Sequence, residues 1–595
     1  MGKSPLFDAE GPVECVILGK GKALSSVLPI VSVDIFYSIN TIPKAVIVIE
    51  DGEMSKGTFP LSDGDDLKPG AEIIIKAGYG TKQEQIFKGI VVRHGISISK
   101  RGRSCVRIEC RHKAIAMTCA RKNANFLQKS DDDIVSEIAG NNGVSISSSM
   151  GGEAHKEILQ YYCTDWDFMM TRAEANGCWL LADDAGMSIE KIAAKGNGDV
   201  ELTWGTDIIE LKAEANALFQ VNKVEANAWD ITTQQVISGN SSMQSLGGQS
   251  NLDNSKLQKV LGVSKNTLQV NSQVSKNMLT SWAEAEQLKN ELSRICGSVV
   301  CVGNTKAKLG GLAVLKNVGD RFKGGALVSG IHHYLGDGDW TTEYTFGMPK
   351  EWYYEKFETS SPIASGWNCG VHGLLTGVVM QIHDDPEKLN RVKVKIPLMG
   401  NAKEDVWARL GGAYASNQFG CMFFPEVDDE VVLGFFGGDP SSPVILGSLY
   451  SGKHVPPQSV EQNNNIKQIL TREKLSIEFN EEKKTITVTT PGNRKFVLDD
   501  DGKKISVEDG SGNKLEMSDS GIKMESKKDI VLDTKGKFNV SAMGGIALTS
   551  KGDLKGEGMN VEFNGKVGFT GKGCAKAEVS ASGQTVIKGA MVMIN

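Results

Sequence analysis

The chain has 595 residues and a net charge of −6, with 67 glycines and 11 cysteines. This length predicts three to five domains, and the acidic balance gives no electrostatic case for nucleic-acid binding. There is no run of 18 apolar residues that would predict a membrane span, and the opening MGKSPLFDAEGP lacks the apolar core of a signal peptide. The cysteines form no C-x-x-C pair, which is typical of reduced cytoplasmic thiols.

Residues 1–125 are predicted to form a first β-barrel. β-branched, partly alternating segments at 43–52, 71–79, 84–99 and 103–117 are separated by turn signals such as Asp51-Gly52. A closed barrel or sandwich is the natural product of such strands. His94 and His112 stand alone on these strands, so structural roles are predicted for both.

Residues 126–365 are predicted to be an α+β region followed by a second barrel. Acids at the start of 130–143 indicate one helix, and Thr164 or Asp165 would cap a second helix that ends at Asn176-Gly177. The buried face of the second helix would consist of Trp166, Met169, Met170 and Ala173.

A Ser-, Asn- and Gln-rich stretch at 235–280 is predicted to be an extended connector or surface excursion. A helix at 281–296 would begin at the capping box formed by Ser281 and Glu284. Strands at 297–304, 309–336 and 339–349 would complete the second barrel. His332 and His333 are not expected to bind a metal, because neighbouring residues of a strand point to opposite faces.

Residues 371–450 are predicted to form an OB-type barrel of five or six short strands. Alternating charge and apolar residues in RVKVKIPL (391–398) indicate a half-buried strand, and tight turns separate the segments. Some OB barrels bind single-stranded nucleic acid through a basic groove and stacking aromatic side chains. Here the four phenylalanines lie in apolar runs, so no such role is expected: Phe423, Phe424, Phe435 and Phe436.

A polar linker is predicted at 451–474, followed by short strands that repeat every nine to ten residues from Leu475. From Asp529 the period tightens to eight. The predicted octads are DIVLDTKG, KFNVSAMG, GIALTSKG, DLKGEGMN, VEFNGKVG, FTGKGCAK, AEVSASGQ and TVIKGAMV, spanning 529–592. In the first five octads, the eighth position is occupied by a residue that tolerates positive φ: Gly536, Gly544, Gly552, Asn560 and Gly568.

One chain of such short strands offers little apolar surface to enclose a core. We therefore expect residues 475–595 to form an intertwined, trimeric β-helix needle in which each strand pairs with the strand of the next chain. The alternative is a loose, glycine-rich tail. The predicted fold class is thus mainly β, with β-barrel hub domains and a few helices, an OB-fold barrel and a C-terminal needle.

The order of hub, OB barrel and needle resembles VgrG, the spike family of type VI secretion and phage-tail-like contractile injection systems. The segments that carry the resemblance are GVVMQIHDDPEKLNRVKVKIP, VWARL and GCMFFPEVDDEVVLGFFGGDPSSPVILGSLY within 377–450, DWDFMMTRAEANG in the hub, GGALVSGIHHY with DWTTEYTFG, and the octads. Asp428 departs from the family pattern, which commonly has glycine there.

The resemblance implies a homotrimeric spike whose hub docks on a hexameric inner tube and baseplate. It also implies a PAAR-type tip protein at the C-terminus, possible effector cargo and transient contact with the target membrane. The spike would be made in the bacterial cytoplasm and expelled on contraction. The resemblance leaves open whether the machine is a membrane-anchored type VI system or a free particle.

The apolar C-terminal end is the candidate docking site for the tip protein. Its residues are Met591, Val592, Met593, Ile594 and Asn595. No catalytic, cofactor-binding or metal residues are expected, because no Walker A, G-x-S-x-G or H-E-x-x-H sequence occurs, and solvated turns are predicted for Asp183-Asp184 and Asp384-Asp385. An effector enzyme with its chemistry in the hub and a trimeric, glycan-binding adhesin or tail-spike remain the alternatives.

Overall fold

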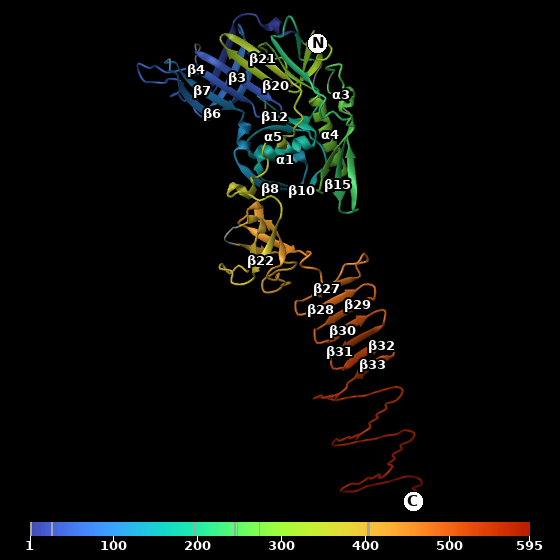
Figure 1. Ribbon diagram of the computed structural model, residues 1–595. Helices are drawn as coiled ribbons and strands as arrows, with labels where there is room; N and C mark the ends of the chain where they lie inside the picture. Colours follow the sequence, from blue (N-terminus) through green and yellow to red (C-terminus); the bar gives the residue numbers. More distant parts are fainter. Residues whose placement is uncertain are drawn as a thin grey trace. The chain divides into compact units, whose positions relative to one another are not determined.

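The computed structural model describes residues 3–24, 28–100, 102–184, 186–194, 198–242, 246, 248–272, 274–400 and 405–594. The chain divides into two compact units, Met1–Leu449 and Tyr450–Asn595. Strands dominate both (Figure 1), so the mainly β prediction is confirmed.

The first unit is built on a 13-stranded sheet in the order β14-β18-β21-β20-β3-β4-β7-β6-β5-β1-β2, with β13 and β19 paired to each other and β19 also to β20. Its strands are β1 (Val13–Gly19), β2 (Lys22–Ala23), β3 (Ile30–Ser38), β4 (Lys44–Glu50), β5 (Glu72–Tyr79), β6 (Lys82–Ile98), β7 (Ser104–Arg111), β13 (Val200–Thr203), β14 (Glu210–Ala215), β18 (Ile295–Val302), β19 (Leu312–Lys316), β20 (Gly324–Gly336) and β21 (Asp339–Phe346).

The strands predicted for the two hub barrels are joined in this one sheet, and their division into two barrels stays a prediction. The junction is the antiparallel pairing of β20 with β3, in which Ile331 is opposite Tyr37. The sheet still covers two hydrophobic cores. One contains Ile35, Ile47 and Phe87, and the other contains Val299, Tyr344 and Phe346.

The two helices predicted in the hub are confirmed. α1 (Asp131–Asn141) begins at a capping box formed by Ser130 and Asp133. α2 (Asp165–Ala175) is capped by the Thr164 hydroxyl, which accepts from the Asp167 amide at 3.1 Å. They pack beside β8 (Arg121–Lys129), β9 (Ile146–Ser148), β10 (His155–Thr164), β11 (Cys178–Asp183) and β12 (Gly186–Lys191).

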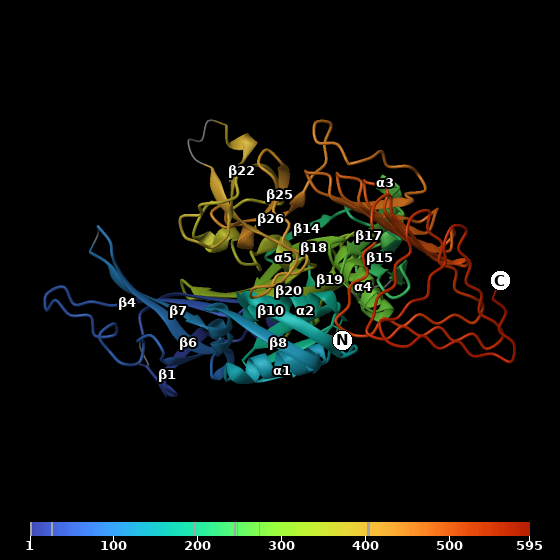
Figure 2. The ribbon, with the colours of Figure 1, turned by 90° about the horizontal axis from the view of Figure 1, so that it is seen from below.

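The predicted connector at 235–280 is wrong, because it holds β16 (Gln235–Asn240), α3 (Asn254–Leu261) and β17 (Lys265–Val270). Both strands pair with β15 (Lys223–Asp230) in a three-stranded sheet. α4 (Lys276–Leu292) packs on this sheet and lies beside β15 in both views (Figures 1 and 2).

The predicted start of α4 is also wrong. Its N-cap is Ser275, whose hydroxyl accepts from the Met278 amide at 3.2 Å, so Ser281 lies inside the helix. The earlier start allows Leu279 and Ala283 to be buried against the sheet, where they share a core with Val224. This burial outweighs the capping signal at Ser281.

The OB barrel is confirmed as a closed barrel of five strands. These are β22 (Leu375–Gln381), β23 (Val392–Lys395), β24 (Val406–Leu410), β25 (Glu430–Phe435) and β26 (Pro443–Ser448). Its core includes Val379, Val394 and Leu433. Short helical segments complete the unit: η1 (Pro5–Asp8), η2 (Lys113–Thr118), α5 (Tyr353–Lys356), η3 (Ile363–Gly366), η4 (Pro397–Met399) and η5 (Phe436–Gly438). Across the described ranges, the helices are too short or too polar to cross a membrane.

The second unit begins with a seven-stranded antiparallel sheet, here named the meander. Its strands are β27 (Ile466–Leu470), β28 (Ser476–Asn480), β29 (Thr485–Thr489), β30 (Lys495–Asp499), β31 (Lys504–Glu508), β32 (Lys514–Ser518) and β33 (Gly521–Glu525). β27 lies inside the predicted linker. Each strand pairs with its neighbour in the same chain, so the predicted pairing with other chains is wrong for this segment.

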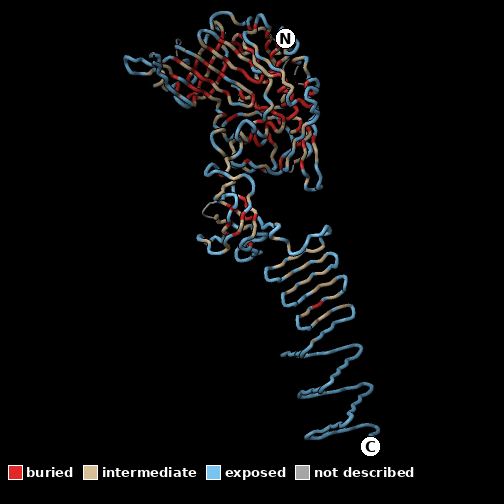
Figure 3. The backbone as a smooth tube through the Cα atoms, viewed as in Figure 1, coloured by how far each residue is buried: buried red, intermediate tan, exposed pale blue. Residues whose placement is uncertain are grey.

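Residues 526–594 follow the meander and form no strand within the described chain. From residue 527 onward they are exposed throughout, in contrast to the buried cores of the first unit (Figure 3). The intertwined β-helix predicted here needs other chains and stays a prediction. The domain boundaries predicted from the sequence likewise stay predictions.

Candidate functional site

The meander is shaped by tight reversals between five-residue strands. Lys484, Asn493 and Lys503 adopt positive φ at successive reversals, and Gly521 has φ of 117° at the last one. Acidic side chains hold the loops, as when Asp509 Oδ1 accepts from the amides of Ser511 and Asn513 at 2.8 and 2.9 Å. These turns return the chain at once, so each strand finds its partner locally.

The register of the meander gathers its apolar side chains into two columns on one face. Directly opposed residues of an antiparallel pair share a face, as do residues two apart in a strand. The first column contains Ile469, Ile477, Val488, Phe496, Val507, Leu515 and Met524. The second column contains Phe479, Ile486, Leu498, Ile505, Met517 and Ile522.

The two columns lack cover in the single chain. Eleven of their residues, all except Leu498 and Leu515, have exposed fractions between 37% and 73%. Burying a large apolar side chain fully is worth about 1.5–3 kcal/mol. A contiguous apolar face of this extent is typical of an interaction surface.

The opposite face of the meander is mainly polar, although Ile466, Leu470 and Val497 also lie on it. Lys514 Nζ lies 3.0 Å from Glu508 Oε1 and 2.8 Å from Glu516 Oε2, which joins neighbouring strands. Hydrogen bonding to Lys514 lowers the pKa of Glu516. The contrast between the faces makes the apolar columns the candidate interaction surface of the meander.

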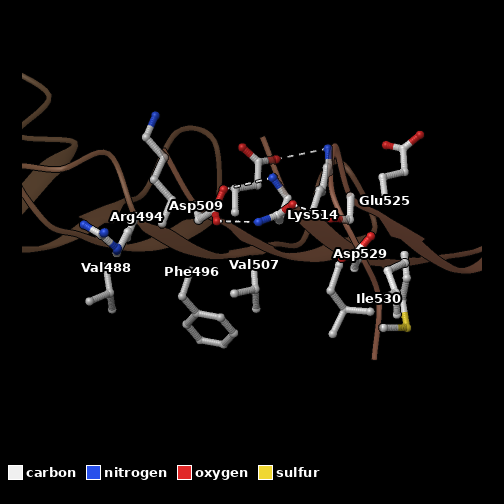
Figure 4. A pocket seen from close by; sticks show the side chains of 15 residues that line it. Val488, Arg494, Phe496, Val507, Asp509, Lys514, Glu525, Asp529 and Ile530 are labelled. Atoms are coloured by element: carbon white, nitrogen blue, oxygen red, sulfur yellow. Dashed lines mark hydrogen bonds and ion pairs between the residues drawn. The ribbon is translucent and has the colours of Figure 1, made fainter. Parts of the chain in front are cut away.

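A groove of about 590 Å³ runs beside the first column. Figure 4 shows Val488, Phe496 and Val507 projecting from the same side of the sheet, while Asp509 and Lys514 lie on the other side. Ile530, the first apolar residue of the octads, also lines the groove. The apolar face therefore continues from the meander into the octads.

The octads are marked in the structure by paired backbone bends. These fall at 535–536, 543–544, 551–552, 559–560, 566–567, 574–575, 582–583 and 590–591. The first four end the octads as predicted, at Gly536, Gly544, Gly552 and Asn560. The fifth bend comes one residue earlier than predicted, so Gly568 starts a unit instead of ending one.

The fifth unit is therefore the seven residues 561–567, here named the short unit, and the later units are 568–575, 576–583 and 584–591. The side-chain pattern agrees with this phase. The residues six and four places before the end of each unit are apolar or small, with one threonine: Ile530 and Leu532, Phe538 and Val540, Ile546 and Leu548, Leu554 and Gly556, Val561 and Phe563, Phe569 and Gly571, Ala577 and Val579, Thr585 and Ile587. A uniform octad frame would place Glu562 and Asn564 at these positions instead.

The candidate docking residues at the C-terminus are strongly exposed. The exposed fractions are 80% for Met591, 81% for Met593 and 88% for Ile594, while Val592 is half-exposed. Asn595 lies outside the described residues. Docking of a tip protein on these residues stays a prediction.

The histidines have the structural surroundings expected of them. His94 lies 2.7 Å from Ser62 Oγ and 2.9 Å from the Leu67 carbonyl, and His112 Nδ1 accepts from the Ala114 amide. His333 is buried 3.0 Å from Thr342 Oγ1, and burial lowers its pKa to about 3.

His332 has carboxylate neighbours that sequence spacing missed. Its Nε2 lies 3.1 Å from Asp34 and its Nδ1 lies 3.7 Å from Glu343, on the two strands paired with β20. Strand pairing supplied these partners, and pairing is not visible in the spacing. No group of three or more His, Cys, Asp or Glu side chains suited to a metal occurs in the described ranges.

The acidic pairs are only partly solvated turns. Asp184 accepts from the Tyr37 hydroxyl at 2.6 Å, from Gln85 Nε2 at 2.9 Å and from the Lys88 amide at 3.0 Å, so it joins separate strands. Asp384 is exposed, as predicted.

Asp385 is buried against Arg391, and the hydrogen bond from that guanidinium holds the pKa of the carboxyl well below its usual value. Its carboxylate also accepts from the amides of Glu387, Leu389 and Arg391. The side chain thus fixes the loop before β23.

The phenylalanines of the OB barrel divide into two pairs. Phe424 and Phe435 pack against the barrel core, while Phe423 and Phe436 are exposed. The Arg409 guanidinium lies 5.6 Å from the centre of the Phe436 ring. A single cation–π contact of this kind does not make a basic groove.

Two known families match successive parts of the chain. Residues 9–337, more than half of the chain, match the Alg8 N-terminal domain family. Residues 375–450 match the type VI secretion system/phage-baseplate injector OB domain.

Curated relatives match over a short segment. The chain is 31% identical to the actin cross-linking toxin VgrG1 of Vibrio cholerae over 77 residues, which is 12% of this chain and 7% of the relative. It is 33% identical to the type VI secretion system spike protein VgrG3 of Vibrio cholerae over 78 residues, 12% of this chain and 8% of the relative. The matched segments thus span less than a tenth of these relatives.

Among solved structures, a 43 kDa tail protein of prophage MuSo2 from Shewanella oneidensis aligns with 57% of this chain and 99% of its own. Its TM-score of 0.45 and identity of 12% are too low to add to the assignment. The match to the injector OB domain and the VgrG relatives confirm the resemblance to VgrG-type spikes. The chain belongs to the Alg8 N-terminal domain family, and it continues into an injector OB domain of the VgrG type.

Proposed function

We propose that the protein is the central spike of a contractile injection apparatus and works as a homotrimer. The observation that carries the proposal is the pair of uncovered apolar columns on the meander. Three copies of the meander, each forming one wall of a prism, would bury both columns of every copy while the polar faces meet water. The octads would continue this shaft by pairing strands of different copies.

Three copies fit better than two. Two sheets could cover each other as a sandwich, with strands from one chain on each side. The octads, however, turn at a bend after every seven or eight residues, and each unit supplies one short side of a turn. Three sides close a prism, and closing it satisfies the backbone groups that an open edge would leave unpaired.

The proposed partners follow from the two ends of the chain. The hub would bind the hexameric inner tube and the baseplate, and the C-terminal end would carry a PAAR-type tip that punctures the target membrane. Effectors could travel with the spike. The protein would be made in the bacterial cytoplasm and leave only with the contracting apparatus. The proposal assigns it no catalytic activity, cofactor or nucleic-acid partner.

Light scattering of the purified full chain tests the assembly. A trimer has three times the 64.1 kDa mass of one chain, and a monomer at micromolar concentration would contradict the proposal. Co-purification tests the role, because a spike should travel with tube and baseplate proteins. Substrate turnover by the isolated chain would favour an enzyme, and cell binding by the isolated chain would favour an adhesin.

Deleting residues 591–595 tests the docking end. The shortened chain should remain trimeric, because neither the meander nor the first seven units lose a residue. It should no longer retain the tip protein in a pull-down. A deletion of similar size in the polar linker, residues 458–462, serves as the control and should retain the tip protein. Unchanged retention by the chain that lacks 591–595 would remove these residues from the docking site.

A further inference from the structure

The short unit interrupts an otherwise regular repeat. In the described part of the shaft, the spacing between successive bends is eight residues everywhere except at 561–567, where it is seven. The missing residue belongs at the start of the unit, because the apolar pair Val561 and Phe563 keeps its distance from the following bend. We call the residues six and four places before the end of each unit the inward pair, because they would face the axis of the proposed trimer. The corner at 559–560 is therefore followed at once by an inward residue, Val561.

The surroundings of the short unit are adapted to a tight packing level. The rings of Phe563 and Phe569, in successive units, have centroids 6.3 Å apart. The neighbouring inward positions are glycines, Gly556 and Gly571. In the proposed trimer, the rings of Phe563 and Phe569 would thus lie next to glycines. The glycines leave room for the same rings from the other copies.

A shaft of identical octads does not by itself specify which units of three copies lie side by side. If one copy is displaced by a whole unit, every inward pair again faces the axis and only the last unit loses its neighbours. A displacement by one residue, in contrast, turns all side chains of a strand to the other face. Within the octads, beyond the height set by the meander, only an element that differs from the repeat can distinguish the correct alignment from one displaced by a unit.

We infer that the short unit is a contact level at which three copies of this chain recognise one another and fix their alignment. This inference rests on the proposed trimer and names the segment that its copies match. When the three short units lie level, all later inward pairs face the axis. When one copy is displaced by a whole unit, its seven-residue short unit lies beside eight-residue units of the other copies. That mismatch shifts the following strands of this copy by one residue relative to their partners.

The alignment has a consequence for the docking end. Three octads, 568–591, follow the short unit, and the last bend closes the third of them. Copies that are level at the short unit end at the same height, and their exposed Met593 and Ile594 side chains then form one flat apolar end. A displaced copy would leave that end stepped by about 4.8 Å, the spacing of neighbouring strands.

The test is a one-residue insertion in the full-length protein. A serine inserted between Asn560 and Val561 converts the short unit into an octad without moving any inward pair. We expect the variant to remain trimeric by light scattering but to lose its single alignment. Hydrogen–deuterium exchange of residues 584–591 should then show two populations, one protected as in the native protein and one with the fast exchange of an unpaired strand.

The matched control moves the short unit and keeps the chain length. Deleting Asp553 together with the same serine insertion shortens the preceding unit to seven residues and leaves its inward Leu554 and Gly556 in place. This variant retains one irregular unit, so it should show a single protected population, as the native protein does. Two populations in the control, or one in the insertion variant, would overturn the inference while leaving the trimer intact. A monomeric native protein would overturn the proposed function and the inference with it.

Discussion

The meander and the octads are neighbouring parts of the second unit, but their backbones differ in how they are paired. In the meander, every strand from Ile466 to Glu525 pairs with a neighbour in its own chain. In residues 526–594 the described chain contains no strand, although the pair of apolar or small residues before each bend recurs, with one threonine. The meander thus lacks cover for its apolar side chains, whereas the octads also lack strand pairing of their backbone.

This difference sets how strongly each segment depends on assembly. A backbone group that is buried without a partner costs about 1–3 kcal/mol, so the octads can be buried only where another strand pairs with them. A three-stranded or larger sheet with one apolar face can persist on its own when that face is covered. We therefore expect the meander to be the part where copies first associate, and the octads to gain structure only within the trimer.

The largest effect is expected from a charge placed in the first column of the meander. Phe496→Asp would bring three carboxylates together inside the prism, where burying unpaired charges is strongly unfavourable. We expect the shaft to fail to associate, and light scattering of the full chain should show loss of the trimer. Thr487→Asp, on the polar face of the adjacent strand, is the control and should leave the mass unchanged. A trimeric Phe496→Asp protein would place the first column on the outside.

A smaller effect is expected from removing a ring in the octads. Phe563→Ala deletes an inward side chain from each copy, and truncation of a buried phenylalanine typically costs about 3–5 kcal/mol. Thermal unfolding followed by circular dichroism should show a lower transition for the shaft, with the trimer still formed at low temperature. Met543→Ala serves as the control, because this side chain is fully exposed at a bend. If the two variants melt at the same temperature, Phe563 does not face the inside of the trimer, and the division of the chain into these units is contradicted.

The smallest effect is expected on the polar face of the meander. Lys514→Ala removes two contacts with carboxylates on a partly exposed surface, and such pairs contribute little because water and salt screen them. The hydrogen bond from Lys514 lowers the pKa of Glu516. The pair therefore stabilises the fold above the unfolded pKa of the glutamate, and its contribution is lost as pH falls through the lowered value.

We expect a slight decrease in melting temperature for Lys514→Ala at neutral pH, and a smaller difference from the native protein both in high salt and in acid. Lys555→Ala in the octads, whose exposed lysine lies 3.7 Å from Asp553, is the comparison. A large, salt-independent loss of stability for Lys514→Ala would show that this face is buried in the assembly.

Most of the architecture could be predicted because it rests on local patterns. Alternation in RVKVKIPL gave a barrel strand, Thr164 capped a helix, and Gly536, Gly544 and Gly552 marked corners. These signals act within a few residues of the chain. The reversals of the meander are equally local, but the spacing of short strands does not indicate whether the neighbouring strand belongs to the same chain, so the pairing within one chain is not predicted.

The errors share a physical cause, which is competition between a local signal and burial elsewhere. The capping signal at Ser281 lost to a helix that begins after Ser275 and buries Leu279 on a distant sheet. Glycine tolerates any φ, so Gly568 predicts a corner, whereas the bend lies at 566–567, in phase with the apolar pair Val561 and Phe563. The partners of Asp184 and His332 come from strands remote in sequence, so spacing could not reveal them.

The most direct test is electron cryo-microscopy of the full-length protein at a resolution that traces single chains along the shaft. We expect neighbouring strands between 466 and 525 to belong to one chain. Neighbouring strands between 529 and 592 should belong to different chains, with the three short units at one height along the axis. Octad rungs that stack within a single chain, or a shaft made of one copy, would contradict the account.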